Sequence, residues 1–238
     1  MIFQQYGAEA ILINFEQKIQ QVINEQVIDL NNAILAAKFP GITYTIPAYC
    51  SLTIGYNRTE VSYDTLCLLI KNIKTIDTEN DVQSKNRILN IPVCYDKEFG
   101  LDLSEVATEK KCSTTEIIHL HTTTLFRVYM LGFLPGFAYM GRLPEALACQ
   151  RKQTPRIRIP ERSVALAGYQ TGIYPSVAPG GWQIIGQTPI PTFRPNQNPM
   201  FLFQAGDQVQ FHAISKKDFH AILKDIDRQH FNWSSIYA

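Results

Sequence analysis

The residues best suited to chemistry in this 238-residue chain are a run of cations near its middle. Five of them fall within twelve residues, with Glu161 as the only acid: Arg151, Lys152, Arg156, Arg158 and Arg162. An arginine guanidinium pairs with a carboxylate or a phosphate through two parallel hydrogen bonds. We therefore expect an anion-binding segment in which Arg156 is a catalytic candidate and Arg151 and Arg158 bind the substrate. A solvated strand face is the alternative, although two prolines argue against a regular central strand.

Glycine-flanked turns with amides, hydroxyls and rings lie on both sides of this segment in the sequence. The stretches 132–141, 168–175 and 179–183 combine glycine and proline, which permit tight turns and a close approach of backbone N–H groups to an anion. We predict a pocket formed by Phe133, Tyr139, Gln170, Thr171, Tyr174, Gly180, Gly181 and Gln187, with Gln170 as a catalytic candidate. This set would orient a ligand, and it lacks a nucleophile, which fits a half-site completed by another chain. A structural loop that closes a barrel is the alternative for 132–141.

His121 is the remaining catalytic candidate, at the predicted end of a helix and before three threonines. An imidazole there would act as a general acid or base at the mouth of a barrel. The alternative is a helix-terminal histidine that interacts with the helix dipole. Glu116 and His119 have the i, i+3 spacing of di-iron bundles, but the motif occurs once, so we expect no metal site.

Cysteine usage, charge and missing motifs exclude several classes of protein. Five cysteines, without a CxxC pair, argue against a disulfide framework and a structural zinc site, and a catalytic cysteine stays as an alternative. Phosphate-loop, dinucleotide-binding, nucleophile-elbow and zinc-protease motifs are missing. The net charge is +1, and no apolar run approaches the roughly 20 residues of a membrane span. The start of the chain does not have the pattern of a signal peptide. We expect a cytoplasmic protein that binds neither nucleic acid nor membrane.

Residues 1–95 are predicted to form an α+β domain that precedes the candidate site. Its predicted elements are a strand at 10–15, a helix at 19–37, strands at 42–46 and 52–56, a helix capped by Ser62, and a strand at 87–93. The order β-α-β-β-α-β is the split βαβ, or ferredoxin-like, plan.

Residues 96–238 change to short apolar runs separated by Gly and Pro, which are typical of a β-barrel or a sandwich. Ser113 and Glu116 form a capping-box pattern that opens a connecting helix, and Ser215 begins a closing helix. The predicted strands include 127–131, 163–167, 183–185, 200–203 and 208–212. This second domain carries every candidate site residue.

Four long segments of this second domain resemble the allophanate hydrolase subunit 1 family. They are YMLGFLPGFAYMG (129–141), TPRIRIP (154–160), AGYQTGIYP (167–175) and PGGWQIIGQTP (179–189), and IPVCYDKEFGLDL (91–103) is also similar. The chain looks most like the stand-alone 5-oxoprolinase B subunits, also described as KipI-type kinase inhibitors. The turn after the first strand departs from the family, since Glu16 stands in place of a glycine and Gln20 in place of an acid. This departure lies outside the predicted barrel.

The resemblance implies an α+β ferredoxin-like domain followed by a cyclophilin-like β-barrel domain. It also implies ATP-dependent conversion of 5-oxoproline to L-glutamate by a heteromeric hydrolase. This chain, inactive alone, would work with the A subunit of that enzyme and with its C subunit, which is like allophanate hydrolase subunit 2. ATP with Mg²⁺ would be bound by the complex.

Three other functions stay open. One is a non-enzymatic inhibitor that binds a sensor histidine kinase. Another is a carboxyltransferase-like component of a urea carboxylase or allophanate hydrolase system. A prolyl isomerase is suggested by the type of barrel alone.

Overall fold

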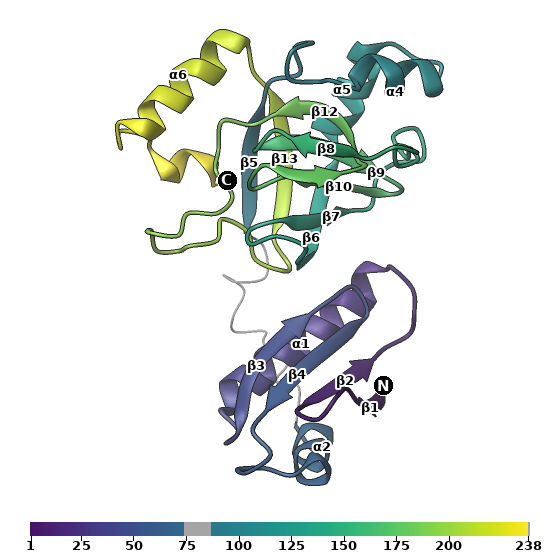
Figure 1. Ribbon diagram of the computed structural model, residues 1–238, viewed down its shortest axis with the longest axis vertical. Helices are drawn as coiled ribbons and strands as arrows, with labels where there is room; N and C mark the ends of the chain where they lie inside the picture. Colours follow the sequence, from purple (N-terminus) through teal and green to yellow (C-terminus); the bar gives the residue numbers. More distant parts are fainter. Residues whose placement is uncertain (74–86, 238) are drawn as a thin grey trace. The chain divides into compact units, whose positions relative to one another are not determined.

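The computed structural model describes residues 1–73 and 87–237, which divide into two compact units. The first unit contains the described residues up to 73, and the second contains those from 87 onward. Each has its own hydrophobic core. Figure 1 shows the helices and strands of each unit. Among the described residues, no helix is both long enough and apolar enough to cross a membrane.

The first unit is a four-stranded antiparallel sheet with two helices packed on one face. Its strands stand in the order β1-β2-β4-β3. The elements are β1 (Ile2–Gln5), β2 (Ala10–Asn14), α1 (Gln21–Ala37), β3 (Ile42–Pro47), β4 (Ser51–Tyr56) and α2 (Tyr63–Lys71). Alternate residues of the two central strands, such as Ile11 and Ile54, are fully buried against Val27 of α1 and Leu66 of α2. This alternation is the period-2 pattern of a half-buried strand.

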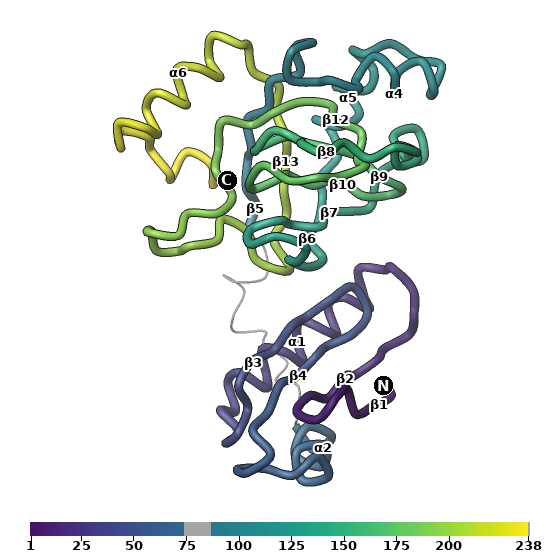
Figure 2. The backbone as a smooth tube through the Cα atoms, viewed as in Figure 1, coloured from purple at the N-terminus to yellow at the C-terminus, as the bar shows by residue number. Residues whose placement is uncertain are grey.

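The fourth strand of the predicted ferredoxin-like plan was assigned wrongly. The sequence predicts it at 87–93, but these residues form β5 (Ile88–Val93) in the second unit. There β5 pairs in parallel with β13 (Gln208–Ala213), and the two strands run side by side in Figure 2. The edge position beside β2 is taken by β1, whose strand the sequence pattern did not reveal. The division of the chain therefore falls before residue 87 rather than at residue 95.

The second unit is built on a seven-stranded mixed sheet whose two ends meet. The strand order is β12-β9-β10-β7-β6-β13-β5. Its other strands are β6 (Leu125–Leu131), β7 (Ala138–Gly141), β9 (Ser163–Ala167), β10 (Gln170–Ile173) and β12 (Gln183–Gln187). Beyond the end of β5, Cys94 bridges to Gln187 of β12 through backbone N–H···O bonds of 2.8 and 3.0 Å. The predicted barrel is thus confirmed as a nearly closed mixed β-sheet.

A second layer and several helices surround this sheet. They are the strand pair β8 (Arg156–Ile159) and β11 (Ala178–Gly180), and the helices α4 (Leu103–Glu109), α5 (Thr114–Thr123), α6 (Lys216–Asp227) and η1 (Trp233–Ile236). In Figure 1, α6 lies on one side of the barrel, and α4 and α5 lie on the other. The main core contains Leu89, Phe126 and Val209, each fully buried.

Local helix signals in the sequence are borne out, and one strand is not. Ser62 and Ser215 cap α2 and α6, and Ser113 forms the reciprocal capping box with Glu116 at the start of α5. The strand predicted at 200–203 is wrong, since within it only Phe201 forms a bridge, to Phe193. Caps depend on neighbours three residues apart, whereas strands depend on distant partners.

Candidate functional site

Three residues of the predicted pocket, Phe133, Tyr139 and Tyr174, lie in a cluster of aromatic rings in the second unit. This aromatic cluster consists of Phe133, Phe137, Tyr139, Tyr174 and Trp182. Phe137 lies at its centre, with ring-centroid distances of 4.8 Å to Tyr139 and 5.4 Å to both Tyr174 and Trp182. Phe133 joins at 5.6 Å from Phe137. All four contacts are edge-to-face, the arrangement that the ring quadrupoles favour.

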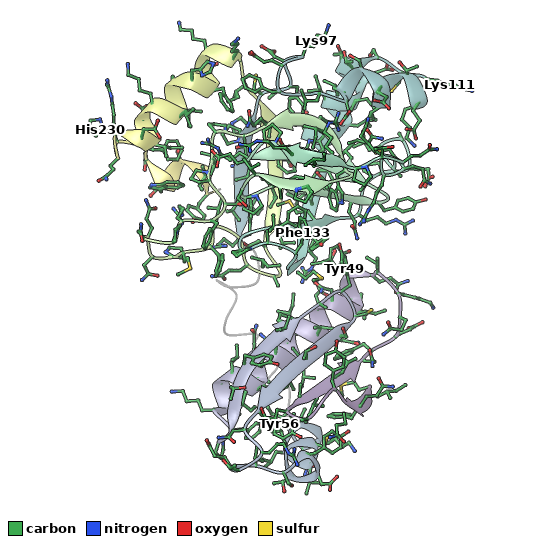
Figure 3. The ribbon with its side chains drawn as sticks, in the orientation of Figure 1. Tyr49, Tyr56, Lys97, Lys111, Phe133 and His230 are labelled. Atoms are coloured by element: carbon green, nitrogen blue, oxygen red, sulfur yellow. The ribbon has the colours of Figure 1, made fainter. Side chains whose placement is uncertain are left out.

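The aromatic cluster extends from the core to the surface. Phe137, Tyr174 and Trp182 are buried, Tyr139 is half-buried, and Phe133 is 59% exposed. Figure 3 labels Phe133 at the edge of the second unit. The cluster therefore has a buried apolar part and an exposed part, and a ligand or a partner could bind on the exposed part.

Two glycines allow the rings to pack directly on the backbone. A Cβ at Gly180 would overlap the hydroxyl of Tyr174, which accepts a hydrogen bond from the backbone N–H of Trp182. A Cβ at Gly172, on β10, would lie 3.1 Å from Phe137 and 3.3 Å from Trp182. The glycine-rich turns singled out in the sequence thus serve close packing of the cluster.

Arg151 places a positive charge beside the aromatic cluster. Its guanidinium carbon lies 6.0 Å from the centroid of the Trp182 ring, at the outer limit of a cation–π contact. Burial raises the pKa of Tyr139 and of Tyr174, that of Tyr174 to about 12, and the Arg151 charge opposes both shifts without cancelling them. Both phenols are protonated at neutral pH, so the cluster offers rings, hydroxyls and a cation but no general base.

A charged cluster lies next to the aromatic one and consists of Asp102, Glu105, Lys152 and Arg156. Asp102, directly before α4, accepts two parallel hydrogen bonds from Arg156 at 2.8 and 2.6 Å. It accepts a third from Lys152 at 2.9 Å and a fourth from the Ile184 backbone N–H at 2.7 Å. Lys152 also donates to Glu105 at 2.9 Å.

The charges of this second cluster are neutralised within the chain. Asp102 is 1% exposed, and burial alone would raise the pKa of its carboxyl. The hydrogen bonds from the two cations and the backbone amide outweigh that effect and hold the pKa below its ordinary value. The guanidinium of Arg156, which the sequence suggests for a substrate anion, is therefore held by an internal carboxylate.

His121 lies in the core of the second unit, not at the mouth of the barrel. Its Nδ1 is 2.7 Å from the Tyr95 hydroxyl, and its Nε2 is 3.1 Å from the Thr171 hydroxyl. Thr171 donates its proton to the Ala165 carbonyl, so it must accept from His121 Nε2–H. Nδ1 then accepts from Tyr95, and the ring stacks on Phe211 at 4.4 Å.

This chain of hydrogen bonds defines His121 as a neutral, fully buried group. Burial lowers the pKa of His121 to about 3, because a charged imidazole would have no water around it. Both ring nitrogens have partners, and the ring is 0% exposed. The expected position at a barrel mouth is thus wrong, and a neutral ring gains little from the helix dipole.

The other predicted site residues have varied surroundings. Gln187 donates from its side chain to the Glu161 carbonyl at 2.6 Å. Arg158 is exposed on β8, and Gln170 is half-buried at the start of β10. The Gly181 carbonyl accepts from the Lys152 backbone N–H at 2.7 Å, which ties the two clusters together. Among the described residues, no group of three or more His, Cys, Asp or Glu side chains is arranged to hold a metal ion.

Sequence reasoning missed three residues that organise the region. Trp182 completes the aromatic cluster around Phe137, which the sequence does suggest as a pocket residue, and Asp102 and Tyr95 hold Arg156 and His121. Trp182 lies within a glycine-rich motif, so its position next to predicted residues was a usable signal. Asp102 and Tyr95 follow β5 in the family-like run 91–103, but only the tertiary fold shows which residues they hold.

The chain is similar to proteins of known family. A family model described as "Carboxyltransferase domain, subdomain C and D" matches residues 1–203. The 5-oxoprolinase B subunit of Bacillus subtilis is 41% identical over 232 residues, which cover 93% of this chain and 96% of that protein. The protein of the same name from Escherichia coli O157:H7 is 32% identical over 207 residues, 86% and 92% of the two chains.

One solved structure with a similar fold comes from a longer chain. The crystal structure of TTHA0988 aligns with a TM-score of 0.79 at 34% sequence identity and covers 87% of this chain. This chain spans 40% of the length of TTHA0988.

Proposed function

Because the chain belongs to the carboxyltransferase subdomain C and D family, we propose that it is the B subunit of a 5-oxoprolinase. The observation that carries this proposal is the 41% identity to the 5-oxoprolinase B subunit of Bacillus subtilis, which extends over 93% of this chain and nearly all of its relative. Such coverage leaves no large part of either protein unmatched.

The proposed enzyme converts 5-oxoproline to L-glutamate at the expense of ATP. The chain works in a heteromer with the A and C subunits of the enzyme and is inactive alone. ATP and Mg²⁺ are bound by the complex, at a site that we do not assign to this chain. The barrel is of the cyclophilin-like type, and the five unpaired cysteines are in keeping with a reducing, cytoplasmic location.

The chemistry of the second unit supports a binding role in that complex. 5-Oxoproline combines a stable lactam amide with a free carboxylate. Its binding needs a cation for the carboxylate, and the opening of the amide needs hydrogen-bond donors for the amide oxygen. The aromatic cluster offers protonated phenols and Arg151, but it has no general base or nucleophile. Such a surface can hold and orient a substrate, and another chain would complete the site.

The test is glutamate release from 5-oxoproline and Mg-ATP, using the purified A and C subunits with and without this chain. We expect release only in the mixture that contains the chain. If the three proteins are folded and form a complex but release no glutamate, the proposed function is wrong.

A carboxyltransferase role is the second candidate, and the description of the matching family model favours it. In that case the complex would move a carboxyl group from carboxybiotin to an acceptor nitrogen, and it would not release glutamate from 5-oxoproline. The expected histidine-kinase partner gains no support from the relatives named above and is not part of the proposal.

A further inference from the structure

The five cations of the segment 151–162 differ in whether the chain itself neutralises them. Three of them form ion pairs with acids of the described residues. These pairs are Arg156–Asp102, Lys152–Asp102, Lys152–Glu105 and Arg162–Glu161. Arg151 and Arg158 have no carboxylate partner among the described residues, and both are exposed. Of these two, Arg151 is the one beside an aromatic ring, that of Trp182.

The surroundings of Arg151 form a surface with one charge and several rings. The Trp182 ring is buried beneath it, and the charge of Arg151 also acts on Tyr139 and Tyr174. Since Tyr139 is only half-buried and Phe133 is exposed, part of the apolar surface is open to a ligand. A small molecule with a flat ring and one carboxylate matches this combination, because the ring can lie on apolar surface while the carboxylate meets the guanidinium.

We propose that Arg151 binds the carboxylate of 5-oxoproline, with the lactam ring against the aromatic cluster. This inference rests on the proposed function, since the substrate is taken from it. Of the arginines that the sequence suggests for an anion, it selects Arg151 and not Arg156, because Asp102 already occupies the guanidinium of Arg156 at 2.6 and 2.8 Å. Arg151 is a binding residue and takes no part in bond breaking.

The test compares Arg151→Gln with a matched control in the reconstituted complex. The control is Arg142→Gln, since Arg142 is also exposed in the second unit and lies over a ring, 4.4 Å from the Tyr169 centroid. We expect Arg151→Gln to raise the KM for 5-oxoproline about tenfold or more, which is about 1.4 kcal/mol of binding. The control should change it less than twofold. A KM within twofold of wild type for Arg151→Gln overturns the proposal, and so does an equal rise in both variants.

An inhibitor without a carboxylate tests the contact of the ring separately from that of the carboxylate. 2-Pyrrolidinone is the same lactam without the carboxylate, so its inhibition constant should be the same for wild type and Arg151→Gln. If the inhibition constant rises in Arg151→Gln as much as the KM for 5-oxoproline does, Arg151 does not bind the carboxylate and the proposal fails.

A second readout keeps the site testable if the wild-type complex releases no glutamate and the proposed function fails. The sequence has two tryptophans, so Trp233→Phe leaves Trp182 as the sole reporter. Titration of this isolated chain with 5-oxoproline should change Trp182 fluorescence in a saturable way that Arg151→Gln abolishes. No change, or the same change in both proteins, overturns the proposed site.

Discussion

The charged cluster and the aromatic cluster are linked through backbone groups of residues 181–184, yet they differ in how their cations are neutralised. Trp182 belongs to the aromatic cluster, and two residues later the Ile184 amide donates to Asp102 of the charged cluster. In the charged cluster, both cations meet an internal carboxylate. Beside the aromatic cluster, Arg151 meets the Trp182 ring. The role of each arginine therefore follows from its partner and not from its place in a basic segment.

The largest expected effect comes from removing the carboxylate of the charged cluster. Asp102→Asn would leave Arg156 without its counter-charge and Lys152 with the exposed Glu105 alone. Loss of one partner of a buried pair costs about 3–5 kcal/mol of the free energy of unfolding. We expect the lower end of that range, because the side chains of Lys152 and Arg156 are 20% and 27% exposed. Urea unfolding of the purified chain measures the change.

Glu105→Gln is the matched control for this substitution. Its carboxylate contacts the same lysine but is 63% exposed, so its removal should cost under about 1 kcal/mol. If Asp102→Asn is no more destabilising than Glu105→Gln, the charged cluster does not hold the fold together.

Both ring nitrogens of His121 have hydrogen-bond partners, and the contribution of this residue to the free energy of unfolding depends on pH. Its pKa is about 3 in the folded chain and about 6.5 when unfolded, so below pH 6.5 the unfolded state binds more protons. Stability therefore falls as the pH falls, by about 2 kcal/mol between pH 7 and pH 5 from this group. The measurement is the free energy of unfolding at both pH values.

His121→Gln removes the titrating group and serves as the reference for that pH dependence. The variant should lose about 2 kcal/mol less than wild type between the two pH values, whatever other groups contribute to both. Equal slopes would mean that His121 can be protonated in the folded chain, which would reopen an acid–base role for it.

The aromatic cluster responds to changes in packing. Gly180→Ala places a methyl group against the buried hydroxyl of Tyr174 and against Ile159, and overpacking of this kind costs about 1–3 kcal/mol. The Tyr174 ring is rigid and 1% exposed, so its hydroxyl has little room to move aside, and thermal unfolding measures the change. Gly168→Ala is a useful contrast, since a Cβ there meets nothing within 4 Å and only the positive φ of 56° opposes it.

The parts of this fold that could be predicted from the sequence are those set by neighbouring residues. Ser113 and Glu116 form their capping box within one helical turn, and 163–167 is continuous enough to be recognised as the buried strand β9. The family was also predictable, because four long motifs carry it. The partner of β5 was not predictable, because its alternating buried residues would suit either sheet.

The candidate site was predictable by region but not by residue. The sequence placed Arg151 and Arg156 in one basic segment, and nothing local distinguishes them. The two arginines differ because Asp102 holds Arg156, and Asp102 is 54 residues away from Arg156 along the chain. His121 was placed at a helix end correctly, but its burial depends on Tyr95 and Phe211 from strands or loops far away in sequence.

The smallest expected effect separates the two arginines most directly. Arg156→Lys keeps the charge beside Asp102 but loses the pair of parallel hydrogen bonds, so it should lower the free energy of unfolding by about 1 kcal/mol. The KM of the complex for 5-oxoproline should stay within twofold of wild type, because this guanidinium serves the fold. Arg151→Gln should do the reverse, with unchanged unfolding and a raised KM. If Arg156→Lys instead raised the KM without loss of stability, Asp102 would be a partner that yields to substrate, and the anion site would belong to the charged cluster.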